Sequence, residues 1–164
     1  MSSQNISLPK FDLRGKSALI TGGAGLLGKE HALALLEVGA NVVLWDVNKE
    51  NLIRVTNELT KDFSEQSVKM SVVDISKEEE VSNAYKELEL QGITISILIN
   101  NAALVGSSDL VGWAVPFEQQ SIDTWRRAIE FNLTAIFDLC QGLLPLLKNA
   151  QGASIINIAS IYGI

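Results

Sequence analysis

The stretch from residue 18 to residue 28, Ala-Leu-Ile-Thr-Gly-Gly-Ala-Gly-Leu-Leu-Gly, constrains the fold of this chain more than any other. A short apolar run stops at Thr21, glycines follow at 22, 23, 25 and 28, and an apolar-periodic segment covers residues 26–38. This order predicts a strand, a tight turn and a helix. Such a turn directs backbone N–H groups and the positive end of a helix at one spot, which suits an anionic phosphate. An ordinary glycine-rich loop has the same local pattern, so the rest of the chain must decide between the two.

Short apolar runs alternate with amphipathic segments along the rest of the chain. Strands are predicted at residues 17–21, 41–45, 68–73, 95–99 and 154–158. Helices are predicted at residues 26–38, 49–62, 77–91 and 122–148, the third capped by Ser76 and the fourth capped by Ser121 and kinked or ended at Pro145. Because buried-type strands joined by helical crossovers form a parallel sheet, we expect one α/β domain over residues 1–164. It is a Rossmann-like, doubly wound parallel sheet in a three-layer αβα arrangement.

The composition argues against several classes of protein. The 164 residues carry a net charge of −6 and no cluster of Lys and Arg, which argues against a nucleic-acid partner. No apolar run reaches the roughly 18 residues of a membrane span, and the polar start lacks the apolar region of a secretion signal. The lone Cys140 suits a core position in a reducing compartment, so we expect a cytoplasmic protein. The acidic run at 78–80 suits a solvated first turn of a helix, so no metal site is predicted.

Asp46 closes the second predicted strand, at the edge where parallel α/β sheets bind their ligands. It stands 18 residues beyond Gly28, and a carboxylate there accepts hydrogen bonds from both hydroxyls of an adenosine ribose. A 2′-phosphate at the same place is repelled, so Asp46 favours NAD over NADP. A turn residue or a helix N-cap is the alternative role of Asp46, but the glycine turn at this spacing favours the ribose.

The later strands also end in polar residues. Asp74, after the third strand, either accepts from an adenine amino group while Ile75 covers the ring, or caps the next helix. After the fourth strand, Asn100 and Asn101 either bridge neighbouring strands or line a cofactor groove. Two more polar residues are further candidates. Asn132 lies in mid-helix among apolar neighbours, and Ser160 lies at the end of the fifth strand.

Four motifs in order resemble those of the short-chain dehydrogenase/reductase (SDR) family, over nearly the whole chain from Phe11 on. They are Thr21–Gly28 as the cofactor turn, Asn100–Ala103 as the Asn-Asn-Ala-Gly motif, Phe131–Thr134 as the segment of the active-site Asn, and Ser154–Ser160 as the strand that ends in the catalytic Ser. The chain resembles the classical type of the family. The resemblance implies an NAD(P)-dependent oxidoreductase that transfers hydride between nicotinamide and an alcohol or carbonyl substrate. It also implies a homo-oligomer for the whole protein.

The resemblance assigns a role to each matching residue. Ser160 donates a hydrogen bond to the substrate oxygen and so stabilises charge that develops in hydride transfer, and Asn132 holds a water of the proton relay. The cofactor, with NAD preferred, is held by Gly22, Gly25, Leu27, Gly28, Asp46, Asp74, Ile75, Asn101 and Ala102.

Three departures from the family pattern matter. Leu26 stands where the classical turn has its middle glycine, and Gly25 gives a spacing closer to the extended subfamily of nucleotide-sugar enzymes. Ala103 replaces the last glycine of the Asn-Asn-Ala-Gly motif. The family's Tyr-x-x-x-Lys motif, whose Tyr is the general acid/base, is absent from the 164 residues. We therefore expect the N-terminal part of a longer enzyme, truncated before that motif, with a sheet that is incomplete at its C-terminal side.

Three functions stay open. The first is an SDR oxidoreductase of which this part alone is inactive, and the Asn100–Asn101 pair and Asn132 favour it. The second is a nucleotide-sugar epimerase or dehydratase of the extended type, which Gly25 favours and Asn100–Asn101 disfavours. The third is a non-catalytic dinucleotide-binding remnant, which the absence of the Tyr and Lys favours.

Overall fold

The computed structural model describes residues 11–105 and 110–160, and one parallel sheet forms the centre of this part. Its strands are β1 (Ser17–Thr21), β2 (Asn41–Asp46), β3 (Val68–Val72), β4 (Ile97–Asn100) and β5 (Ser154–Asn157). They lie in the order β3-β2-β1-β4-β5, so the chain winds outward from β1 in both directions. In register, Ile20 of β1 pairs with Leu44 on one side and with Ile99 on the other. The predicted doubly wound parallel sheet is confirmed.

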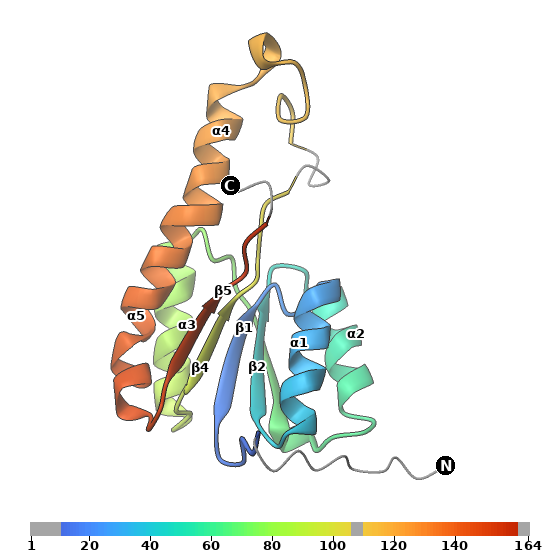
Figure 1. Cartoon of the computed structure of the whole chain (residues 1–164), viewed down its shortest axis with the longest axis vertical. Helices are drawn as coiled ribbons and strands as arrows, with labels where there is room; N and C mark the ends of the chain where they lie inside the picture. The colour runs from blue at the N-terminus through green and yellow to red at the C-terminus, as the bar shows by residue number, and fades with distance from the viewer. Residues whose placement is uncertain (1–10, 106–109, 161–164) are drawn as a thin grey trace.

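Helices cover both faces of the sheet (Figure 1). One face carries α1 (Leu26–Glu37) and α2 (Lys49–Leu59), and the other carries α3 (Glu78–Leu90) and α5 (Ala135–Asn149). A shorter helix, α4 (Ile122–Ile129), extends the line of α5 beyond the sheet through a π-helical turn, η3 (Glu130–Thr134). Two single 3-10 turns are η1 (Glu65–Ser67) and η2 (Phe117–Gln119). The predicted αβα layers are therefore present, and no helix of the described residues is long and apolar enough to cross a membrane.

Two apolar cores, one on each face of the sheet, hold the layers together. Buried residues at helical spacing on α1 and α2 form one of them: Ala32, Leu36, Leu52, Val55 and Leu59. Those on α3 and α5 contribute to the other: Val81, Ala84, Leu88, Leu139, Leu143 and Leu147. Burial of one such leucine stabilises the fold by about 1.5–3 kcal/mol. These cores fix the carboxyl ends of β1, β2 and β4 relative to one another.

The long helix predicted over residues 122–148 is confirmed in its extent, which α4, η3 and α5 cover, but it is not one continuous α-helix. Its α-helical hydrogen bonding is interrupted at η3, and Pro145 does not end it, because α5 continues to Asn149. Pro145 lies on the exposed side of α5, where the backbone carbonyl that it leaves without a donor can reach water. The predicted cap of this helix is confirmed, since the Ser121 hydroxyl accepts from the Thr124 N–H at 3.4 Å.

The predicted N-cap Ser76 is also wrong. The N-cap of α3 is Lys77, which caps the helix with no side-chain hydrogen bond, and the Ser76 hydroxyl donates upstream to Asp74 instead. Helix α2 ends at Leu59, before the predicted residue 62, and the other predicted bounds differ from the observed ones by a few residues at most. Element ends depend on local hydrogen bonds that apolar spacing does not report.

The isolated chain is expected to self-associate through its exposed apolar surfaces. In the described residues β5 is an edge strand that pairs only with β4, and Ile155 and Ile156 on it are 43% and 45% exposed. On α4 and α5, Trp125 and Phe137 are 53% and 64% exposed. Unpaired edges and large apolar patches drive association. Light scattering after size exclusion should show species larger than a monomer, whereas a monodisperse monomer that unfolds cooperatively would contradict this expectation.

Candidate functional site

A groove of about 560 Å³ lies at the carboxyl ends of the strands. The glycine turn, the end of β2, the segment after β3 and the segment after β4 all contribute to its walls. Most of the residues predicted to hold a cofactor line it: Gly22, Gly25, Leu27, Asp46, Ile75, Asn101 and Ala102. Gly28 and Asp74 do not line it. Residues distant in sequence thus converge on one hollow at the sheet edge where such folds bind ligands.

The glycine turn is packed so closely that three of its positions, Gly22, Gly23 and Gly28, leave no room for a side chain. Gly22 has a φ of +63°, and a Cβ there would lie 2.9 Å from the Ala102 Cα. A Cβ at Gly28 would lie 2.2 Å from the Gly22 carbonyl oxygen and 2.8 Å from the Gly23 Cα. Gly28 therefore lets the first turn of α1 rest directly on the strand-to-helix turn, although it does not line the groove.

The N-terminus of α1 opens toward the groove without a side-chain cap. Gly25 is its N-cap, forms no side-chain hydrogen bond to the helix, and lines the groove with Leu26 and Leu27. The first turn of α1 contains no acidic residue. Its first backbone N–H groups and the positive end of the helix dipole are therefore available to an anion.

Hydrogen bonds between Thr21, at the end of β1, and Asn101, just after β4, brace the turn. The buried Thr21 hydroxyl accepts from the N–H groups of Asn101 and Ala102, both at 3.1 Å, and lies 3.5 Å from the Ile99 carbonyl as a donor. The Asn101 amide donates to the carbonyls of Thr21 at 3.0 Å and of Gly22 at 3.2 Å. Asn101 thus both lines the groove and fixes the turn. The sequence reasoning missed Thr21, whose signal is a hydroxyl between a buried strand and the first glycine.

Asp46 lies between the glycine turn and the start of α2. Its Oδ2 accepts from the Ala24 N–H at 3.0 Å, and its Oδ1 accepts from the Asn48 N–H at 2.9 Å. The N-cap of α2 is Asn48, whose side chain accepts from the Asn51 N–H, so Asp46 is not the cap of that helix. Each oxygen of a carboxylate accepts two hydrogen bonds. Asp46 therefore keeps an acceptor position on each oxygen beside the turn.

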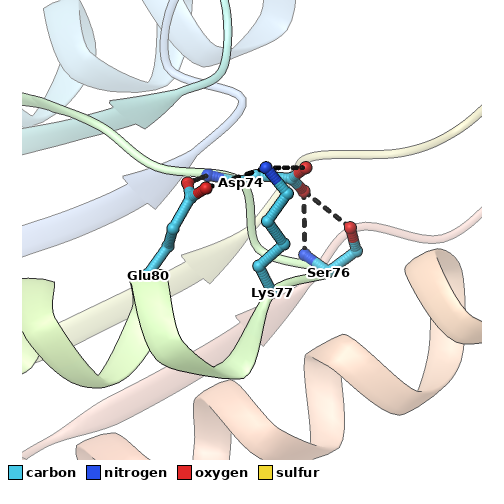
Figure 2. A network of polar contacts seen from close by, with 4 residues as sticks. All are labelled: Asp74, Ser76, Lys77 and Glu80. Carbon is cyan, nitrogen blue, oxygen red and sulfur yellow. Dashed lines mark hydrogen bonds and ion pairs between the residues drawn. The ribbon is translucent and has the colours of Figure 1, made fainter.

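Asp74 and Ile75 follow β3, and their side chains differ in placement. Ile75 is 6% exposed and lines the groove. The Asp74 Oδ1 accepts from the Ser76 N–H at 3.0 Å and from the Ser76 hydroxyl at 2.7 Å (Figure 2). Partial burial acts to raise the pKa of Asp74, but the bonds from Ser76 and the charge of Lys77 together lower it below its ordinary value. Asp74 is therefore a charged turn residue beside the groove.

Asn100 bridges neighbouring strands, as one of the two predicted roles of the asparagine pair requires. Its Nδ2 donates to the Asn157 Oδ1 at 2.8 Å, and its carbonyl accepts from the Ile158 N–H at 3.0 Å. These bonds tie the end of β5 to the end of β4. Ser160 follows β5 by three positions, so the bridge fixes the strand that leads to Ser160.

Asn132 lies in the π turn η3, and its side chain binds the segment after β4. The Asn132 Oδ1 accepts from the Leu104 N–H at 2.8 Å, and its Nδ2 donates to the Leu104 carbonyl at 3.0 Å. Single π turns inside α-helices are frequent at functional sites. The neighbouring Phe131 lines the groove, which places this turn at the same end of the sheet as the glycine turn. In the described residues, no group of three or more His, Cys, Asp or Glu side chains is placed to hold a metal ion.

A family model described as short chain dehydrogenase matches residues 16–164. The chain belongs to the short-chain dehydrogenase family. One relative, the short chain dehydrogenase/reductase dpfgG of Gibberella zeae, is 40% identical over an alignment of 164 positions that covers 98% of this chain and 56% of the relative. The 3-oxoacyl-[acyl-carrier-protein] reductase FabG of Chlamydia muridarum is 30% identical over 93% of this chain and 58% of the relative. The chain therefore spans a little over half the length of these relatives.

Solved structures of the family superpose on this chain. The Pseudomonas aeruginosa RhlG/NADP active-site complex matches with a TM-score of 0.82 and 30% identity, over 95% of this chain and 59% of that one. A short-chain dehydrogenase/reductase from Brucella melitensis, whose description names glucose/ribitol dehydrogenase, matches with a TM-score of 0.80 and 26% identity, over 92% and 59%. The resemblance drawn from the four sequence motifs is confirmed at the level of the family.

Proposed function

We propose that the groove binds NAD, and that the whole protein is an oxidoreductase that transfers hydride between the nicotinamide and an alcohol or carbonyl substrate. The observation that carries this proposal is the Asp46 carboxylate bound to the Ala24 N–H, because it joins a ribose acceptor to the phosphate turn within one groove. The NADP complex of RhlG supports a nicotinamide cofactor in the family. The choice of NAD over NADP rests on Asp46.

The residues of this chain fit each part of the dinucleotide. The uncapped N-terminus of α1 after Gly25 offers N–H groups to the pyrophosphate, and Gly22 and Gly28 allow the close approach of backbone that a side chain would block. The free acceptor positions of Asp46 take the ribose hydroxyls, and Ile75 covers the adenine. By resemblance, Leu27 cradles the cofactor together with the glycines, Asn101 and Ala102 lie toward the nicotinamide, and Asp74 lies beside the adenine. When bound, the nicotinamide supplies or takes up the hydride.

The proposed catalytic residues act on the substrate oxygen and on a proton. Ser160 donates a hydrogen bond to that oxygen, and this bond strengthens as negative charge develops there. Asn132 holds a water for proton transfer. The two hydrogen bonds between the Asn132 side chain and Leu104 fix the side-chain amide. The Oδ1 of this amide keeps a second acceptor position for that water.

The proposal extends to the partners and the compartment of the protein. We propose a small-molecule substrate, a homo-oligomer for the whole protein, and work in the cytoplasm, which the free Cys140 favours. The net charge of −6 argues against a nucleic acid as partner.

The second candidate function is that of a nucleotide-sugar epimerase or dehydratase. One observation favours it: Gly25, at the spacing of that subfamily, is the N-cap of α1, and Leu26 follows it with its side chain 91% exposed. The asparagine pair, with Asn100 bridging β4 to β5, favours the oxidoreductase. Titration of the chain with NADH, followed by nicotinamide fluorescence and by displacement with NAD, tests the cofactor site that both functions share. Incubation of a longer chain with nucleotide sugars and catalytic NAD separates them, because an epimerase releases no net NADH.

The isolated chain is expected to bind NAD without steady turnover, because its 164 residues contain no Tyr-x-x-x-Lys motif. A general acid/base contributes about 10²–10⁴-fold to rate, so NADH production should fall by at least that factor against a longer chain that carries the motif. NADH absorbance with a panel of alcohols measures this. Steady production that scales with protein concentration and disappears in Ser160→Ala would show that the chain is catalytic by itself.

A further inference from the structure

Four side chains close the connection between β3 and α3 (Figure 2). Asp74 binds downstream, since its Oδ1 accepts from the N–H and the hydroxyl of Ser76. Glu80 binds upstream from the first turn of α3, since its Oε2 accepts from the Asp74 backbone N–H at 2.8 Å. Lys77 lies between the two carboxylates, 2.8 Å from the Glu80 Oε1 and 3.7 Å from the Asp74 Oδ2. The connection is therefore held from both ends.

The bond from Glu80 replaces a missing strand contact. The ladder between β2 and β3 ends at Val72, and the last backbone bond to β2 is donated by the Val73 N–H to the Asp46 carbonyl at 3.1 Å. The next N–H in the chain belongs to Asp74, and Glu80 is the acceptor that the structure gives for it. Without Glu80, the Asp74 N–H loses this acceptor, and the backbone bond that still joins Asp74 to the start of α3 is the one from the Lys77 N–H to the Asp74 carbonyl, at 3.0 Å.

Ile75 is the residue that this anchor places. It lies one position beyond the anchored N–H, belongs to the same buried apolar cluster as Val81, and forms part of the groove wall. Its backbone is fixed before it by Glu80 and after it by the two bonds from Ser76 to Asp74. The position of this groove wall therefore depends on a carboxylate that does not itself line the groove.

Glu80 is chemically suited to this task. The hydrogen bond from Lys77, and then that from the Asp74 N–H, lower the pKa of Glu80 below its ordinary value, so the side chain is a charged acceptor at neutral pH. Hydrogen bonds to a charged acceptor are about twice as strong as neutral ones. The sequence groups Glu80 with Glu78 and Glu79 as one acidic turn, but the Glu79 side chain has no hydrogen-bond or ion-pair partner among the described residues.

We propose that Glu80 is a positioning residue for nucleotide binding, which acts through the Asp74 backbone to hold Ile75 against the adenine. This inference rests on the proposed function, because it takes the Ile75 end of the groove as the adenine end. It predicts a defect confined to ligands that contain adenine, since the phosphate turn and Asp46 are supported by other contacts.

Calorimetric titration of the full chain with AMP, with NAD and with nicotinamide mononucleotide tests this role. Glu80→Ala should weaken AMP and NAD by the same factor, about tenfold, and leave nicotinamide mononucleotide unchanged. Glu80→Gln should recover most of the AMP affinity, because its amide oxygen still accepts from the Asp74 N–H. The matched control Glu79→Ala should bind all three ligands as the wild type does. Hydrogen exchange of the Asp74 amide should accelerate in Glu80→Ala and not in Glu79→Ala.

Two results would overturn this inference and leave the proposed function standing. One is an unchanged AMP affinity in folded Glu80→Ala while the wild type binds AMP, and the other is an equal loss for AMP and nicotinamide mononucleotide, which would indicate general loosening. If the wild type binds neither AMP nor NAD, the proposed function fails and this inference with it. Should Glu80→Ala not fold, Glu80→Asp replaces it, because the shorter side chain keeps its charge but cannot span from α3 to the Asp74 N–H. The same loss for AMP is expected.

Discussion

Replacing Gly28 by Ala is expected to lower the NAD affinity of the chain at least about tenfold and to destabilise the fold by about 1–3 kcal/mol. The new Cβ would lie 2.2 Å from the Gly22 carbonyl oxygen and 2.8 Å from the Gly23 Cα. Because both of these atoms belong to the backbone, no side-chain rotation relieves the contact. The first turn of α1 must then move away from the turn. That movement separates the helix N-terminus from the place where the pyrophosphate is proposed to bind. NADH fluorescence titration measures the affinity, and urea unfolding measures the stability.

The matched control for this variant is Gly92→Ala. Gly92 has a φ of +67°, so Ala there is strained by about 1–2 kcal/mol, but nothing lies within 4 Å of its Cβ. Both variants should therefore lose comparable stability, while only Gly28→Ala should lose NAD affinity. Equal affinity for NAD in the two variants would mean that the packing of α1 on the turn has no part in binding.

Replacing Asp46 by Asn is expected to weaken NAD about 10–100-fold and to leave NADP affinity unchanged or improved. The lost charge weakens the bonds to both ribose hydroxyls, whereas a 2′-phosphate no longer meets a carboxylate. The Asn oxygen still accepts one of the two backbone bonds, from Ala24 or Asn48, so the turn keeps part of its support. Parallel titrations with NAD and NADP give the ratio of the two affinities.

Asp62→Asn is the control for charge alone, because Asp62 is exposed, lies beyond the end of α2 and does not line the groove. Its NAD-to-NADP ratio should equal that of the wild type. If folded Asp46→Asn also kept the wild-type ratio, the ribose assignment of Asp46 would be wrong.

Much of the site could be predicted because each of its parts depends on a short local pattern. The glycine turn and Asp46 both directly follow apolar runs, and in a parallel sheet the ends of such runs meet at one edge. Asn100 illustrates the limit of this reasoning. The sequence left open whether it bridges strands or lines a groove, and the partly buried hydrogen bond to Asn157 shows that it bridges.

The remaining features depend on geometry that spacing does not contain. The connection after β3 carries one Ser, one Lys and several carboxylates within seven positions, so many pairings are possible, and only the fold selects Glu80 for the Asp74 N–H. The π turn at η3 is hidden for a similar reason, because the apolar residues Trp125, Ile129 and Leu133 continue at helical spacing across it. The bonds from Asn132 to Leu104, which cross 28 positions of sequence, lie within it.

Mapping of NAD binding by amide chemical shifts of the isotopically labelled chain tests the central claim most directly. We expect saturable shifts that cluster at the glycine turn, at Asp46 and Val47, at Ile75, and at Asn101 and Ala102, and that shrink in Asp46→Asn. A second cavity, between α3 and α5, is lined by Tyr85 and Gly142 and shares Ile75 with the groove. Shifts confined to that cavity, or no shifts in the folded wild type, would contradict the assignment of the groove as an NAD site.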